Sequence, residues 1–165
     1  MIKKLFFTGI VALGLAACNN GGAESTDEHM HDHDHEAMEE AVEEAGDESL
    51  YVPEGARVFF ANLNDGDTVT SPVFIQFGIE GMEVKPAGEI VKGTGHHHII
   101  IDGSFDALGD VVAADDTHIH FGGGQTETEQ ALAPGMHTLT MQFANGIHQS
   151  YGEQMSATIT VYVTE

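Results

Sequence analysis

The chain has 165 residues, enough for a leader, a linker and one domain with a modest core. It carries 27 acidic residues against 5 lysines and arginines, a formal net charge of -22. Such an acidic surface repels nucleic acid and concentrates cations, so no nucleic-acid partner is expected. The single cysteine excludes a disulfide within the chain.

Residues 1–17 are predicted to be a lipoprotein signal peptide. Lys3 and Lys4 precede an apolar run that is too short for a permanent membrane span, and the run ends in "LAAC" at Cys18. This ending resembles the bacterial lipoprotein box, which implies cleavage before Cys18 and acylation of its sulfur, palmitate included. Several acyl chains on one residue hold a protein on a membrane. We therefore expect an exported protein, lipid-anchored to the cell envelope on the periplasmic face or the cell surface.

Residues 18–50 are predicted to form a disordered acidic tether. Between residues 19 and 50 lie twelve acids, no lysine or arginine and almost no large apolar side chain. Such a segment cannot bury enough surface to offset the entropy of ordering. Its histidines stand at every second position, at His29, His31, His33 and His35. Imidazoles on a flexible chain can wrap Zn, Ni or Cu, which predicts a secondary metal-binding segment; the alternative is a polar spacer.

Residues 51–165 are predicted to form one all-β domain. Short runs rich in β-branched and aromatic residues alternate with turn signals such as "NDGD", "APG" and "ANG". The expected strands are "ARVFFAN", "VFIQFGIE", "HHHIIID", "THIHF", "HTLTMQF" and "SATITVYVT". No amphipathic helix separates them, so the pattern indicates an antiparallel immunoglobulin-like β-sandwich of about seven strands. Pro86 and the glycines of "GMEVKPAGEIVKGTG" predict a loop or a sheet edge.

Two histidine blocks lie within these expected strands. Side chains alternate along a strand, so His118 and His120 share one face of "THIHF". The apolar side chains of that strand share the opposite face, which places the His pair on the outer face or the rim of the sandwich. In "HHHIIID", His96 and His98 share a face that excludes His97. Either that pair binds metal while His97 packs at the edge of the core, or the block begins as a loop and His97 points inward.

The predicted metal ligands are the four histidines of these outer pairs: His96, His98, His118 and His120. On neighbouring strands they would bring four neutral nitrogens together, a donor set that suits Cu, Zn or Ni better than Mg or Ca. Three further histidines are reserve ligands: His97, His137 and His148. Of these, His137 shares the apolar face of its strand, and His148 lies in a loop. The carboxylates expected to orient the imidazoles are Asp102, Asp115 and Asp116.

The segment "FGGGQTETEQALAPG" is predicted to be a loop. Gly122, Gly123 and Gly124 allow unusual backbone angles and the close approach of another group, either a ligand or a bulge. The polar residues after them either contact a ligand or stabilise the turns of the loop, and the structural role is favoured. No lysine follows and no helix begins, so this is not a phosphate-binding loop.

The blocks "GHHHIIID" and "HIHFGGGQTE", together with the late His148, resemble an uncharacterised bacterial domain of unknown function found in exported and lipid-anchored proteins. The resemblance extends roughly from Val58 to Val163. Because that family has no established activity to carry over, the resemblance implies the limits of the domain and no catalytic residue.

The predicted function is binding of a transition metal, Cu or Zn, for scavenging, buffering or delivery to an envelope metal-handling protein. An alternative is a ligand or protein interaction module whose histidines are structural. A weaker alternative is a cupin-like metalloenzyme, because His118, His120, Glu127 and His137 follow the cupin order, although Glu127 lies too far from His120 for that motif. No arrangement typical of a hydrolase stands out, and a binding protein is favoured over an enzyme.

Overall fold

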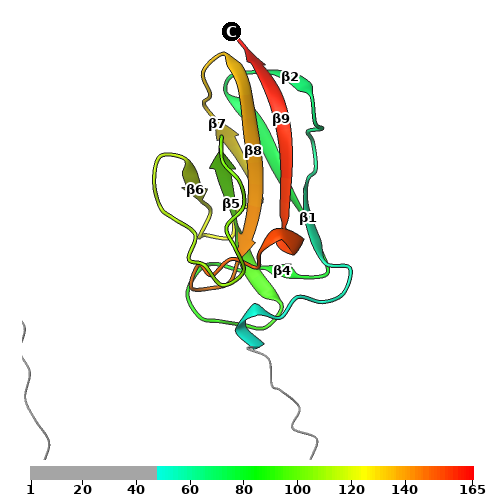
Figure 1. The fold of residues 1–165 in the computed structure, drawn as a ribbon, viewed down its shortest axis with the longest axis vertical. Coiled ribbons are helices and arrows are strands. Elements are labelled where there is room, and N and C mark those ends of the chain that lie inside the picture. The colour runs from blue at the N-terminus through cyan, green and yellow to red at the C-terminus, as the bar shows by residue number, and fades with distance from the viewer. Residues whose placement is uncertain (1–47) are drawn as a thin grey trace, which may run out of the picture. The chain divides into compact units, whose positions relative to one another are not determined.

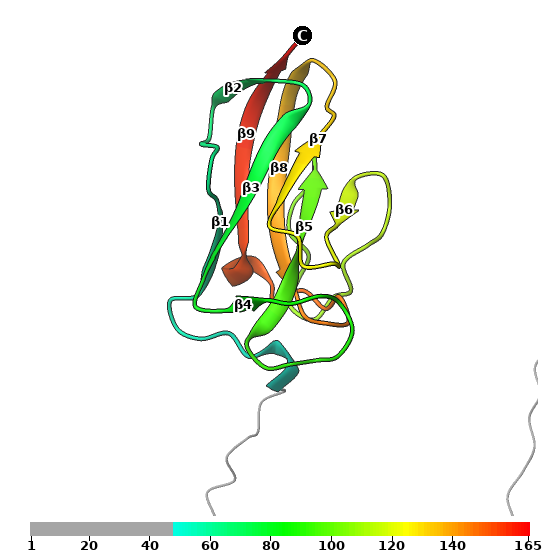
Figure 2. The same cartoon turned by 180° about the vertical axis from the view of Figure 1, so that it is seen from behind.

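The computed structural model describes residues 48–165; the predicted signal peptide, Cys18 and the histidines of the predicted tether lie outside the described residues. Two β-sheets pack face to face, which confirms the predicted all-β sandwich (Figures 1 and 2). Two short 3-10 helices accompany them, η1 (Glu48–Leu50) and η2 (Glu153–Met155). Within residues 48–165, no helix is long and apolar enough to cross a membrane.

The smaller sheet has three strands in the order β1-β3-β7, and the larger has six. The larger follows the order β2-β9-β8-β5-β4, and β6 also pairs with β5. The strand bounds are β1 Arg57–Phe60, β2 Asp67–Thr70, β3 Val73–Glu80, β4 Glu83–Val84, β5 Thr94–Ile101, β6 His118–His120, β7 Glu127–Gln130, β8 Gly135–Ala144 and β9 Ser156–Thr164.

Six of these nine strands coincide with or overlap the six expected runs. The other three are short: β2 and β7 were not expected, and β4 lies at the edge of the larger sheet, in the segment predicted to be a loop or a sheet edge. Two of the three pair in parallel, β2 with β9 and β4 with β5, so the sandwich is not wholly antiparallel. The third, β7, lies in the segment predicted to be a loop and pairs with β3. Its residues "ETEQ" carry no apolar alternation, and its pairing to a longer strand overrides that weak local preference.

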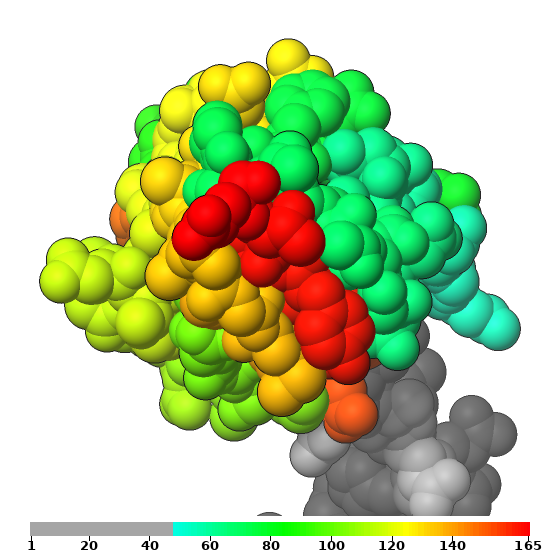
Figure 3. All heavy atoms as spheres, turned by 90° about the horizontal axis from the view of Figure 1, so that it is seen from above, coloured from blue at the N-terminus to red at the C-terminus, as the bar shows by residue number. Residues whose placement is uncertain are grey.

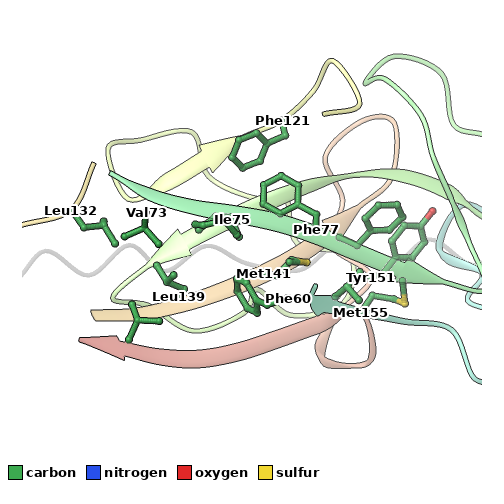
Figure 4. Packing of buried hydrophobic residues seen from close by; sticks show 14 of the residues in the cluster. Phe60, Val73, Ile75, Phe77, Phe121, Leu132, Leu139, Met141, Tyr151 and Met155 are labelled. Carbon is green, nitrogen blue, oxygen red and sulfur yellow. The ribbon is translucent and has the colours of Figure 1, made fainter. Parts of the chain in front are cut away.

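The core lies between the two sheets. Val73, Ile75 and Phe77 of β3 are buried against residues such as Leu139 and Met141 of β8 (Figure 4). At one side of this core the rings of Phe77 and Phe121 lie 4.7 Å apart. Period-two alternation therefore gives these strands one apolar face each, as the sequence predicts.

Strands β5 and β8 are buried on both faces, which the sequence analysis did not foresee. The loop of residues 102–117, between β5 and β6, folds over their outer face and projects from the side of the sandwich (Figure 3). Thr140 Oγ1 donates to Gly103 O at 2.8 Å, and Asp106 N donates to Gln142 Oε1 at 3.2 Å. A second, more polar layer is thus enclosed between the larger sheet and its connecting loops.

Candidate metal centre

Four imidazoles meet in this second layer. Two come from β5, at His96 and His98; one comes from β6, at His120; the fourth, His148, lies in the loop after β8. The antiparallel register sets His98 directly opposite His120, which brings their rings to 5.0 Å between centroids. His98 and His120 therefore lie side by side on neighbouring strands, as expected for the two histidine blocks.

The Nε2 atoms of the four rings form a chain of short contacts. His98 Nε2 lies 3.0 Å from His96 Nε2, and His96 Nε2 lies 3.2 Å from His120 Nε2. His120 Nε2 in turn lies 3.1 Å from His148 Nε2. Ligand nitrogens about 2.0–2.1 Å from a metal lie about 3.3 Å apart in a tetrahedron and about 2.9 Å apart for neighbours in a square plane. These three separations match those of neighbouring ligands on one ion.

His96, His98 and His120 form a group whose ligand atoms all lie within 4.8 Å of one another, which is compatible with holding a metal ion. Burial is graded across it. His96 and His98 are 0% and 1% exposed, whereas His120 is exposed. All three lie on the outer face of the larger sheet, as the alternation predicts, but the β5 pair is buried there. His120 and His148 pack against both of its rings, and residues 111–114 line a pocket beside His98.

Gly122 makes room for the inward turn of the His120 ring. A Cβ atom at this position would collide with Cε1 and Nε2 of His120. If the register of β6 on β5 is continued by two residues, Gly122 lies across from His96. Because Gly122 has no side chain, the imidazoles of His96 and His120 can approach each other there. The close approach that the glycine run predicts is thus made by a histidine ring of the same strand.

His148 owes its position to Asn145, a residue that the sequence analysis did not single out. Asn145 is fully buried, and its Oδ1 accepts from the backbone N–H groups of Ile147 and Gln149 at 3.1 and 3.0 Å. His148 itself has φ = +71°, a left-handed conformation that is uncommon for residues other than glycine, although asparagine, aspartate and histidine adopt it more often than the rest. The motif "ANG" indicated the turn, but not that the turn delivers an imidazole to a site formed by distant strands.

The environment keeps the buried imidazoles neutral. Burial, followed by the nearby rings of His120 and His148, lowers the pKa of His96 to about 4. Burial, followed by the neighbouring histidines, lowers the pKa of His98 to about 2. The pKa of His120 is also lowered, by burial and then by His148. A neutral imidazole is the form that binds metal, so at neutral pH these lone pairs are available.

Hydrogen bonds alone satisfy this cluster poorly. His96 Nε2 contacts two other ring nitrogens, yet a neutral imidazole nitrogen is either one donor or one acceptor. A single cation would use all the Nε2 lone pairs together, with the protons on Nδ1. The Nδ1 atoms of His96 and His98 are buried and have no hydrogen-bond partner among the described residues, which departs from the usual pattern in which a metal-bound imidazole donates to an oxygen.

The structure places the other predicted ligands elsewhere. His118 lies opposite Ile100, and its Nδ1 is 2.8 Å from Asp115 Oδ1. His137 lies 3.0 Å from Asp102 Oδ2 through Nδ1 and 3.0 Å from Ala133 O through Nε2. Two of the expected orienting carboxylates thus serve histidines outside the four-imidazole cluster.

His97 occupies the opposite face of β5 from His96 and His98. Its ring lies 5.0 Å from both Phe77 and Phe143, and it is 0% exposed. Of the two arrangements considered for this block, the structure has the one in which His97 packs with the core while His96 and His98 point to the other face.

The cupin-like set is not assembled. Glu127 belongs to β7 in the smaller sheet, where its Oε2 accepts from Gln76 Nε2 at 3.4 Å. His137 is paired with Asp102. The order of these residues along the chain therefore does not correspond to a shared site, because the residues lie in different sheets or have other partners.

A family-wide sequence model described as a domain of unknown function (DUF4399) matches residues 75–164. This match confirms the resemblance predicted from the histidine blocks. No curated protein and no solved structure matches the chain.

Proposed function

Because the chain belongs to the DUF4399 family, whose description assigns no activity, we propose a function from its own residues: the domain binds one transition-metal ion through His96, His98, His120 and His148. The observation that carries the proposal is the convergence of four Nε2 atoms at separations of 3.0 to 3.2 Å along the cluster. Three of the four are the group compatible with a metal ion, and His148 adds a ligand from a loop.

The donor set narrows the choice of metal. Four neutral nitrogens favour Cu(II) or Zn. Among the divalent first-row transition metals, the affinity of a protein site generally rises toward Cu(II). Oxygen-preferring Ca and Mg have no carboxylate or carbonyl ligand in the cluster. The net charge of -22 attracts any cation toward the protein and does not discriminate among metals.

The cellular role belongs to the same proposal. The ending "LAAC" at Cys18 supports a lipid anchor at the cell envelope, and the acidic segment with His29, His31, His33 and His35 supports a second, weaker metal-binding region. A protein of this kind scavenges or buffers metal outside the cytoplasm, or delivers it to another envelope protein. These segments lie outside the described residues, so the sequence alone supports this part.

Calorimetric titration tests the proposal on a soluble chain of residues 19–165 in which the four tether histidines are alanine. We expect one equivalent of Cu(II) or Zn to bind, and no heat with Ca. Ligand variants are His120→Ala and His148→Asn, which change the more accessible members of the cluster and leave the buried β5 pair in place.

Matched controls are His118→Ala and His137→Ala, which remove imidazoles bonded to Asp115 and Asp102 instead. Loss of binding in the ligand variants together with retention in the controls supports the four-histidine centre. If the parent chain binds neither Cu(II) nor Zn, the metal function is abandoned and the interaction module becomes the leading alternative.

A further inference from the structure

A pocket of about 210 Å³ opens beside the four-histidine centre. Three of the four imidazoles line it, those of His98, His120 and His148. The remainder of the wall is four consecutive residues of the loop between β5 and β6: Val111, Val112, Ala113 and Ala114. His96 does not line the pocket, so the pocket lies on one side of the imidazole cluster.

The wall of this pocket is fixed to the loop that carries His148. Val112 N donates to His148 O at 2.9 Å, and Ser150 N donates to Asp110 O at 2.8 Å. A bridge also joins Val111 to Gln149. The pocket and one of its imidazoles therefore hold a constant geometry relative to each other, as a built binding site requires.

The chemistry of the lining divides into two parts. The imidazole side presents nitrogen atoms and, in the proposed function, a metal ion. The valine and alanine side presents no side chain that can donate or accept a hydrogen bond. A volume of this size exceeds the share of a single water, about 30 Å³, several times. The pocket thus suits one small molecule with a single donor atom and an apolar body.

Charge selects further among such molecules. The loop that supplies the apolar wall, residues 102–117, contains five acids: Asp102, Asp106, Asp110, Asp115 and Asp116. With a net charge of -22 for the whole chain, this surface disfavours an anion relative to a neutral molecule.

We infer that the metal keeps an exchangeable coordination position facing this pocket, and that a small neutral molecule with one nitrogen or oxygen donor, of about the size of imidazole, occupies it. This inference rests on the proposed function. Four protein ligands close a tetrahedral Zn site, but a metal ion can expand to five ligands, so the pocket would make the centre a receptor for a fifth, exchangeable ligand as well as for a metal.

The test uses the same chain of residues 19–165 loaded with one equivalent of Cu(II). Imidazole is the probe, azide is the anionic comparison, and electron paramagnetic resonance reports the copper environment. Gel filtration after the titration verifies that copper stays bound. We expect a saturable change in the copper spectrum with imidazole, and weaker binding of azide.

Ala113→Phe and Ala114→Phe fill the pocket from its apolar side, and Ala107→Phe is the control in the same loop, at an exposed residue outside the lining. We expect the filling variants to retain copper and to bind imidazole at least about tenfold more weakly, since the phenyl ring would compete with the ligand for the same space. The inference is overturned if imidazole leaves the spectrum of the copper-loaded parent chain unchanged, or if the parent and all variants bind imidazole with equal affinity. Failure to bind copper overturns the inference, and failure to bind zinc as well overturns the proposed function.

Discussion

The Nε2 atoms of His120 and His148 lie 3.1 Å apart, although 28 residues separate them in the chain. One ring projects from an edge strand and the other from a loop in a left-handed conformation. Backbone strain of this kind costs of order 1–3 kcal/mol and persists where the surrounding structure imposes it. Here Asn145 imposes it, through two hydrogen bonds to the backbone on either side of His148.

His148→Asn is expected to weaken metal binding while preserving the fold. Asparagine tolerates the positive φ at this position but has no imidazole nitrogen at the reach of Nε2. Even the loss of a residue that only orients a ligand typically costs 10–100-fold in affinity, so the loss of a ligand should cost about 100-fold or more. Competition with a chromophoric chelator measures the affinity, and His118→Asn is the control. Equal affinities in the two variants would exclude His148 from the ligand set.

Gly122→Ala is expected to lower metal affinity without removing any histidine. The new methyl group occupies the space of the His120 ring, and because His120 is exposed, its ring can move outward at little cost in stability. We expect a loss of roughly 10–100-fold in affinity and a nearly unchanged melting temperature. Gly123→Ala is the matched control, since its Cβ would meet only the flexible side chain of Gln125. Parent-like affinity in Gly122→Ala would show that the ring does not need this space.

His97→Leu is expected to stabilise the protein. Both nitrogens of His97 are buried without a hydrogen-bond partner among the described residues, and an unsatisfied buried polar group typically costs about 1–3 kcal/mol. Leucine is apolar and of similar size, so the free energy of unfolding should rise by up to that amount in urea denaturation. Metal affinity should stay unchanged, because His97 faces the core. A drop in both quantities would instead give His97 a polar role at the site.

The metal-free protein is expected to lose stability as the pH falls from about 6.5 toward 4. The unfolded histidines take up protons near pH 6.5, whereas burial holds the folded-state pKa of both His96 and His97 at about 4. Above pH 6.5 both states are deprotonated and stability is at its full value; below it the unfolded state binds more protons. Each such group contributes a slope of about 1.4 kcal/mol per pH unit in that window.

Melting temperatures recorded by circular dichroism between pH 8 and pH 4 follow this loss. His97→Leu removes one of the titrating groups, so its curve should be shallower than that of the parent. Parallel curves for the two proteins would mean that His97 is not held neutral by the fold.

The alternation of apolar residues was sufficient to predict most of the larger strands and the opposite faces of His97 and its two neighbours. It was not sufficient for β7, whose polar residues form a strand only because β3 offers a partner. Nor did it indicate that β5 is buried on both faces, because the cover comes from a loop that has no periodicity of its own.

The sequence by itself determined which residues share a face, since side chains on a strand alternate whatever the strand packs against. It thereby separated His96 and His98 from His97. Only the tertiary structure decided which other histidines join them. His118 and His120 are equivalent by alternation, but the register sets one opposite Ile100 and the other opposite His98. His148 enters from a loop whose path is fixed by hydrogen bonds of Asn145, and no periodic pattern encodes such a contact.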